Sequence, residues 1–151
     1  MSVNIFGTDY PIATTTILDL PDNQMTYIPE SITLLTNLEE LHLSDNEITD
    51  IPDNISSLIN LRELLLSHNE ITNIFDNISL LINLRSLYLS HNEITNIPES
   101  ISSLTNLQEL YLSDNHIDDL SVVEAMSLKY SDFSNQTHKP KPLLYLSNII
   151  V

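Results

Sequence analysis

The sequence predicts an α/β solenoid of stacked 23-residue repeats, and three observations support this fold class. A nine-residue segment that begins at Leu38 recurs from Leu61, Leu84 and Leu107, always at a step of 23 residues. Apolar residues alternate within this segment, as in a short strand, and the spacer after it has apolar residues three or four apart, as in a helical or 3₁₀ turn. One unit is too small to bury its own aliphatic side chains, so the units are expected to stack.

The chain divides into three parts along this pattern. Residues 1–14 are expected to form an N-terminal capping segment, residues 15–120 hold the repeats, and residues 121–151 hold a degenerate repeat and a capping tail. The first repeat is incomplete, because Thr15 replaces its first leucine. Residues 128–136 fit the strand pattern at a shortened step of 21, which predicts a degenerate strand there. Two prolines predict a loop at residues 138–142.

One asparagine follows every strand segment, at the point where the chain must turn away. An amide side chain both donates and accepts hydrogen bonds, so it can satisfy backbone groups that the turn removes from the sheet. We therefore expect a buried structural ladder of Asn23, Asn46, Asn69, Asn92 and Asn115.

The spacers begin with a proline that precedes an acidic residue. Pro29, Pro52 and Pro98 suit the first position of a helical turn, where no amide donor is needed. Phe75 takes this place in one repeat, either as a variation in packing or as a contact on the convex side.

Residues 84–106 read Leu-x-x-Leu-x-Leu-Ser-x-Asn-x-Ile-Thr-x-Ile-Pro-x-x-Ile-x-x-Leu-x-Asn. This pattern resembles the leucine-rich repeat family, in particular the 23-residue subclass of intracellular Ras-associated scaffolds and of many bacterial, amoebal and viral repeat proteins. The resemblance covers about residues 15–120. It implies a curved, right-handed solenoid with a parallel β-sheet on the concave face and 3₁₀ or short helical turns on the convex face.

Composition limits the function. The 151 residues include 21 acidic and five basic side chains, for a formal net charge of -16, and no cysteine. This charge opposes phosphate, so we expect no binding to nucleic acid or to a membrane, and a protein partner of basic or mixed charge. The lack of cysteine excludes a thiol nucleophile and a cysteine-based zinc site. Together with an N-terminus unlike a secretory signal, it favours the cytoplasm.

The outward side chains of the strands are the candidate binding residues. Alternation along each strand directs them away from the buried leucines, into rows across the sheet. Exposed aromatic and aliphatic groups flanked by charges are typical of protein-binding hot spots. The expected contacts are His42, Leu65, Tyr88 and Tyr111, supported by Glu40, Glu63 and Glu109 and, at the edge, by Arg62 and Arg85. The alternative is that these are solvated strand residues, selected for β-propensity.

Two other kinds of site are less favoured by the residues. His68 and His91 fall in one row with Asp45 and Asp114, which are ligand types for zinc, but side chains at equivalent repeat positions tend to be parallel rather than convergent. No acid, base and nucleophile converge in the pattern, and Gly7 is the single glycine, so no phosphate-binding loop exists. We expect neither a metal, nor a cofactor, nor an enzymatic activity.

The leading functional hypothesis is a non-enzymatic protein-interaction module that binds through the concave face, and a second hypothesis is structural. The chain could be a self-associating unit or a partial repeat protein, whose ends pair with another copy to give a homodimer. The segments Val3–Phe6 and Leu144–Leu146 are the candidate uncovered edges, because unpaired strand edges recruit further strands.

Overall fold

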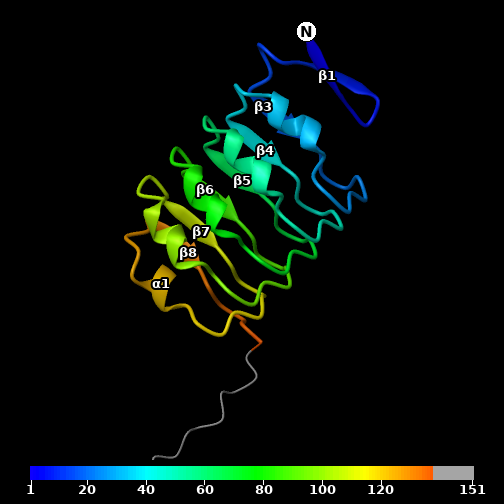
Figure 1. The fold of residues 1–151 in the computed structure, drawn as a ribbon. Helices are drawn as coiled ribbons and strands as arrows, with labels where there is room; N and C mark the ends of the chain where they lie inside the picture. Colours follow the sequence, from blue (N-terminus) through cyan, green and yellow to red (C-terminus); the bar gives the residue numbers. More distant parts are fainter. Residues whose placement is uncertain (138–151) are drawn as a thin grey trace, which may run out of the picture.

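The protein is a stack of coils with strands on one face and, on the opposite face, 3₁₀ turns in the first four coils and a short helix in the coil after them (Figure 1). This computed structural model describes residues 1–137. The six parallel strands lie in chain order as β3 (Ile17–Asp19), β4 (Glu40–His42), β5 (Glu63–Leu65), β6 (Ser86–Tyr88), β7 (Glu109–Tyr111) and β8 (Tyr130–Asp132). The turns are η1 (Glu30–Leu34), η2 (Asp53–Ser57), η3 (Asp76–Leu80) and η4 (Glu99–Ser103), and a short helix α1 (Ser121–Glu124) follows β7. The predicted α/β solenoid is confirmed.

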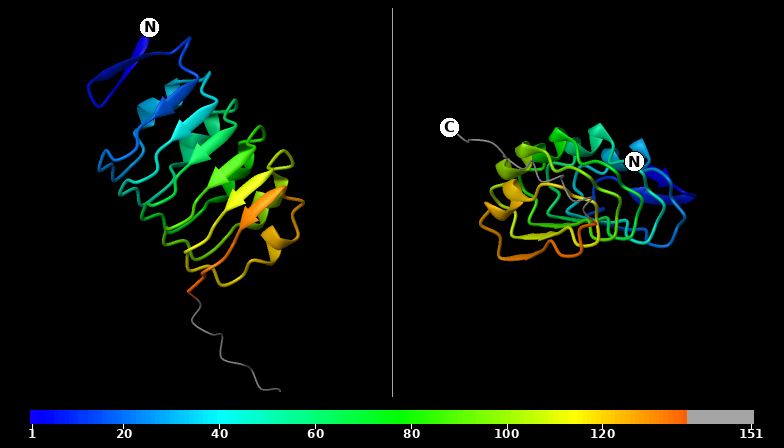
Figure 2. Two further views of the ribbon diagram at one scale, coloured as in Figure 1. Left: turned by 180° about the vertical axis from the view of Figure 1, so that it is seen from behind. Right: turned by 90° about the horizontal axis from the view of Figure 1, so that it is seen from below.

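The sheet lines the concave face, and the 3₁₀ turns cover the other side (Figure 2). Between them lies an aliphatic core in which the central leucines of four successive strands, Leu41, Leu64, Leu87 and Leu110, have no exposed area. Isoleucines from the turns close the other side of this core. Burial of these side chains in the stack is the main source of the fold's stability.

The strand register follows the repeat step. From β3 to β7 each residue pairs with the residue 23 positions later, so Leu64 lies opposite Leu87. Between β7 and β8 the step shortens to 21, which places Ser131 opposite Leu110 and Asp132 opposite Tyr111. The strand expected within residues 128–136 is therefore confirmed. Ser131 is exposed, in contrast to the buried leucine at this place in the earlier strands.

Buried asparagines join each coil to the coil before it. The Asn92 amide nitrogen donates to the carbonyl of Leu66 in the preceding coil at 2.9 Å and to that of Leu89 at 3.0 Å. Its side-chain oxygen accepts the backbone N–H of Ile71 at 3.0 Å. Asn46, Asn69 and Asn115 repeat this arrangement. Each asparagine thus satisfies buried backbone groups of two coils at once.

Asn23 is a correction to the expected ladder. It is exposed, and its amide nitrogen donates to Pro21 within its own turn at 2.7 Å. A ladder asparagine bonds to the coil before its own, and the hairpin that precedes β3 offers no such coil. Asn23 takes part through its backbone instead, because its N–H donates to the Asn46 side-chain oxygen. At the other end Gln136 stands in for asparagine, donating to Leu112 at 2.7 Å and accepting from Ile117 at 3.0 Å.

A second set of asparagines, not predicted from the sequence, runs along the edge where the strands begin. Asn60 donates through its side chain to the Thr36 carbonyl, Asn83 to Ile59 and Asn106 to Ile82, at 2.8–2.9 Å. Asn37 makes the corresponding bond to Ala13 at 3.0 Å. These bonds tie successive coils together at a second place.

The residue before each ladder amide adopts a left-handed backbone. Asp45, His68, His91, Asp114 and Asn135 have φ values between 55° and 57°. Asparagine, aspartate and histidine are the non-glycine residues most often found in this region. The chain therefore turns sharply after each of the strands β4 to β8 without using glycine.

The prolines lie one position earlier than expected. Pro29, Pro52 and Pro98 are the capping residues with extended ψ values, and the acidic residue after each is the first of the 3₁₀ turn. Phe75 caps η3 in the same conformation, with φ -90° and ψ 161°, and remains 44% exposed.

A β-hairpin precedes the first coil. Strand β1 (Ser2–Ile5) pairs antiparallel with β2 (Thr8–Pro11), and the side chains of Val3 and Ile5 are buried in the core. One edge of the Val3–Phe6 segment is therefore paired rather than uncovered. The other candidate edge, Leu144–Leu146, the loop at 138–142 and the tail after it lie outside the described residues.

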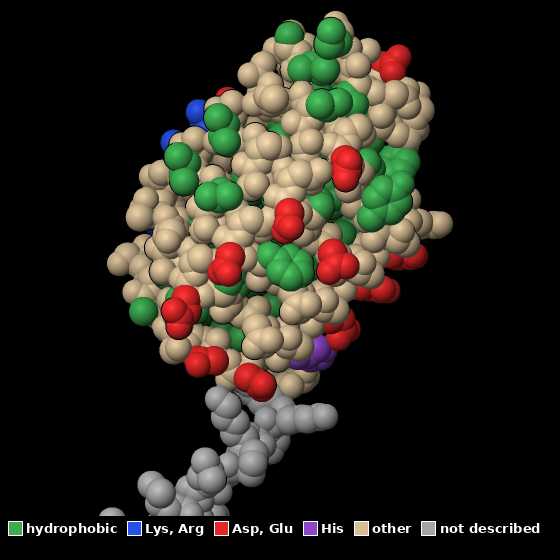
Figure 3. All heavy atoms as spheres, in the orientation of Figure 1, with side chains coloured by type: hydrophobic (Ala, Val, Ile, Leu, Met, Phe, Trp, Pro, Cys, Tyr) green, Lys and Arg blue, Asp and Glu red, His purple; other side chains and the backbone are tan. Residues whose placement is uncertain are grey.

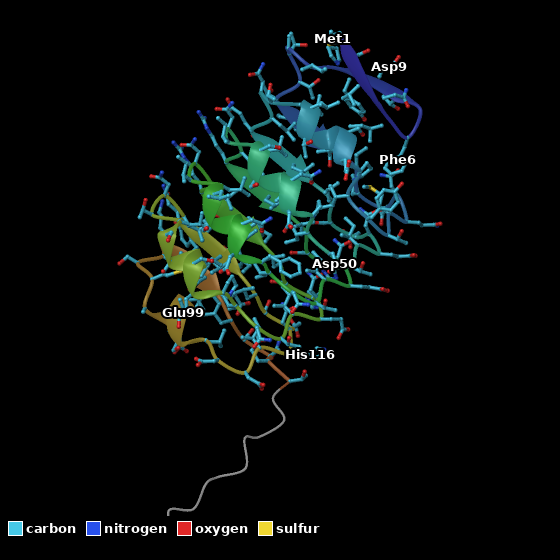
Figure 4. All side chains as sticks on the ribbon, viewed as in Figure 1. Met1, Phe6, Asp9, Asp50, Glu99 and His116 are labelled. Atoms are coloured by element: carbon cyan, nitrogen blue, oxygen red, sulfur yellow. The ribbon has the colours of Figure 1, made fainter. Side chains whose placement is uncertain are left out.

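At the C-terminal end, His116 links the last coils (Figure 4). Its Nε2 lies 2.6 Å from Glu93 Oε2, and its Nδ1 hydrogen-bonds to Thr137 Oγ1.

Within residues 1–137, no helix has the length and hydropathy of a membrane span.

The ladder gives a prediction for stability. Replacement Asn92→Ala leaves the N–H of Ile71 and the carbonyls of Leu66 and Leu89 without their buried partner, so we expect a loss of about 3 kcal/mol in the free energy of unfolding. The measurement is urea denaturation followed by circular dichroism. Asn96→Ala is the control, because Asn96 is exposed and its side chain hydrogen-bonds to the adjacent Thr95, and a change below about 0.5 kcal/mol is expected. Equal losses in the two variants would contradict the role of the ladder.

Candidate functional site

The central outward row of the sheet holds the predicted contact residues. The register aligns Asp19, His42, Leu65, Tyr88, Tyr111 and Asp132 across β3 to β8. Neighbouring members belong to strands about 4.8 Å apart. Asp132 extends the predicted row by one residue, and the backbone N–H of Ser134 lowers the pKa of its carboxyl group. The row therefore has acidic ends and an aliphatic and aromatic centre.

The two tyrosines of this row form one unit. Their rings stack with centroids 4.7 Å apart and an angle of 19° between the planes. The Tyr88 hydroxyl donates to Glu109 Oε2 at 2.7 Å. This hydrogen bond, and next the burial of the phenol, raise the pKa of Tyr88 well above its ordinary value. The bond fixes the orientation of the ring pair, which favours a preformed contact over a mobile one.

His42 lies among carboxylates from three strands. Its Nδ1 is 3.7 Å from Asp19 Oδ1, and its Nε2 is 3.6 Å from Glu40 Oε2 and 3.5 Å from Glu63 Oε1. The Nε2 atom is buried and has no hydrogen-bond partner among the described residues. The predicted residues His42, Glu40 and Glu63 are thus brought together on the concave face, where acidic charge exceeds what one imidazole can balance.

Arg62 and Arg85 lie apart from these rows. They line a groove of about 380 Å³ at the edge where the strands begin, together with Asn60, Asn83 and Asn106. Arg62 pairs with Glu39 at 3.2 Å. The space-filling view, which looks onto the convex side, shows basic groups at one edge of the molecule, beside exposed hydrophobic groups (Figure 3). Each arginine comes one residue before its strand, so strand alternation does not direct it onto the concave face.

The histidine pair stacks instead of converging. The His68 and His91 rings are 4.2 Å apart with 12° between their planes, and His91 Nε2 lies 3.5 Å from Asp114 Oδ2. Parallel rings direct their nitrogen atoms side by side, whereas tetrahedral zinc needs ligands that point to one centre. Within residues 1–137, no group of three or more histidine and carboxylate side chains is arranged to hold a metal ion.

Comparisons with known proteins agree with the fold. The sequence profile of the leucine-rich repeat family matches residues 13–71 and 59–117. No curated protein sequence matches the chain significantly. Among solved structures, a leucine-rich repeat protein of Leptospira interrogans is 36% identical with a TM-score of 0.72, and covers 78% of this chain and 31% of its own.

Two further structures extend this comparison. Internalin C2 of Listeria monocytogenes is 33% identical with a TM-score of 0.70, over 78% of this chain and 51% of its own. A chain of the BIR3–SERK2 complex of Arabidopsis thaliana is 34% identical with a TM-score of 0.69, over 83% of this chain and 70% of its own. The chain thus spans about a third and about half of the two bacterial proteins.

The Tyr88 hydroxyl makes stability depend on pH. Because its pKa is raised in the folded state, the native protein holds the phenol proton more tightly than the unfolded chain does. The contribution of the Tyr88 hydroxyl to the free energy of unfolding is complete at pH values below the pKa of a tyrosine in the unfolded chain, about 10. It is lost as the pH rises through the pKa of Tyr88 in the folded protein. We therefore expect the wild type to lose more free energy of unfolding than Tyr88→Phe between about pH 9 and about pH 11.

Urea denaturation across this pH range is the measurement. Tyr27→Phe is the matched control, because Tyr27 is 62% exposed. This variant should follow the wild type. Identical slopes for the wild type and Tyr88→Phe would show that the hydroxyl has no such role.

Proposed function

Because this chain belongs to the leucine-rich repeat family, we propose that it is a non-enzymatic interaction module whose concave face binds a basic or mixed-charge segment of another protein. The observation that carries this proposal is the central row, in which Leu65 and the stacked Tyr88–Tyr111 pair lie between carboxylates. Large aromatic groups at the centre of a patch with a charged rim are the usual composition of a binding hot spot.

The geometry also supports tight binding at little ordering cost. The strands that carry the row are paired on both sides from β4 to β7, and the leucines between the outward residues are buried. Tyr88 is held by Glu109 and Tyr111 before any partner arrives. A surface that is already ordered loses little conformational freedom on association.

Charge supports the class of partner. The chain has a net charge of -16, and the carboxylates of Asp19, Glu40 and Glu63 open onto the concave face with 37–64% of their side chains exposed. The negative electrostatic potential of these carboxylates accelerates the approach of a basic segment and repels an acidic one. Among the similar structures, the BIR3–SERK2 complex is itself an assembly of two proteins.

Affinity capture from a cell lysate tests this function. The bait is the full chain, compared with the double variant Tyr88→Ala/Tyr111→Ala, whose folding is checked by circular dichroism. We expect the double variant to lose the specific partners, because it removes the centre of the hot spot. Increasing salt should also weaken capture by the wild type, since the charges are exposed.

The control is Tyr27→Ala/Phe75→Ala, which removes two exposed aromatic side chains outside the sheet. It should capture the same proteins as the wild type. An unchanged set of partners with Tyr88→Ala/Tyr111→Ala would refute the concave face as the binding site.

A further inference from the structure

The concave face has two chemically different parts. The first, which we call the carboxylate basin, consists of Asp19, Glu40 and Glu63 around His42. Three carboxylates meet one imidazole, whose Nε2 is buried without a hydrogen-bond partner among the described residues. Even a protonated imidazole leaves an excess of negative charge there. A guanidinium or ammonium group from a partner is the chemical complement of this basin.

The second part, which we call the aromatic ridge, consists of Leu65, Tyr88 and Tyr111. The tyrosines stack on one another, and the Tyr88 hydroxyl donates a hydrogen bond to Glu109. This bond engages the Tyr88 hydroxyl, so the ridge offers a partner mainly apolar surface. Apolar and aromatic side chains are the groups that gain most from burial against such a surface.

The distance between the two parts sets a spacing for the partner. The distance across the sheet from His42 on β4 to the middle of the Tyr88–Tyr111 pair is two and a half strand intervals. At about 4.8 Å for each interval, this is about 12 Å. In an extended peptide, side chains on one face are two or four residues apart, and four residues span about 13 Å. A residue two positions from the cation lies near Leu65.

The sheet also fixes how such a segment lies. Strands β4 to β7 are paired on both sides, so a peptide over this face is recognised by its side chains and crosses the strands rather than adding to them. On the basis of the proposed function, we infer that the concave face recognises an extended segment with Lys or Arg in the carboxylate basin, an apolar residue two positions along and an aromatic or aliphatic residue four positions along.

Fluorescence anisotropy with synthetic peptides tests this inference on the full chain. The first probe is Gly-Ser-Arg-Ser-Leu-Ser-Phe-Ser-Gly, which has the inferred spacing with the cation N-terminal to the apolar residues, so that the peptide runs from β4 towards β7. The second is Gly-Ser-Arg-Ser-Leu-Ser-Ser-Phe-Gly, which has the same composition but moves the last apolar residue to the opposite face. We expect the second peptide to bind at least about tenfold more weakly, a difference of about 1.4 kcal/mol.

A charge reversal tests the basin separately. Glu63→Lys should weaken the first peptide about tenfold and strengthen the same peptide with Glu in place of Arg. Glu99→Lys is the matched control, because Glu99 lies on the convex turn η4, away from the sheet (Figure 4). It should change neither affinity.

The outcomes separate this inference from the proposed function. The inferred spacing is overturned if the two peptides bind equally or if the first does not bind. It is also overturned if Glu63→Lys and Glu99→Lys have the same effect. If lysate capture still depends on Tyr88 and Tyr111, the concave face remains the binding site and the inference alone fails. If capture is independent of both tyrosines, the proposed function fails as well.

Discussion

The satisfaction of backbone groups where each strand ends is the constraint on which this structure depends. A chain that turns away from a sheet in every coil leaves N–H and C=O groups in the core, and leaving them unpaired is costly. The buried asparagines solve this by bonding to two coils at once, as Asn92 does with Leu66 and Ile71 of the preceding coil and with Leu89 of its own. They therefore fix the position of one coil on the next. The register of the outward rows, and so the shape of the concave face, follows from these buried amides.

The concave face combines groups that the repeat makes identical with groups that it leaves free to differ. The central inward residue is a fully buried leucine in all five strands from β3 to β7. The outward places next to these leucines hold His42, Leu65, Tyr88 and Tyr111 in strict register. Because all these strands have the same backbone conformation and register, the side chains of the row differ in chemistry but occupy equivalent positions. The binding surface is thus a series of side chains presented at a constant interval.

The sequence predicts the repeat, the strands and the composition of the rows, because all three follow from a constant step of 23 residues. The prediction from sequence fails where the contacts of a residue depend on the segment before or after its own coil. Asn23 has the right residue type, but no earlier coil for its amide to bond to. Arg62 and Arg85, which were expected at the edge of the sheet, line the groove at the edge where the strands begin. The asparagines at 37, 60, 83 and 106 have the same 23-residue spacing, so this second ladder was present in the sequence as a signal.

Coupling between neighbouring coils determines where local unfolding of the protein begins. Each coil is held by the coils on either side, through the core and both sets of asparagines, so loss of order in one coil is expected to spread to its neighbours. Ser131 takes the place of a buried leucine in β8, which leaves the coil of β8 with less apolar surface to hold it. Local fraying, and the associated exchange of amide hydrogens with solvent, should therefore begin at β8 and reach Tyr111 before Tyr88.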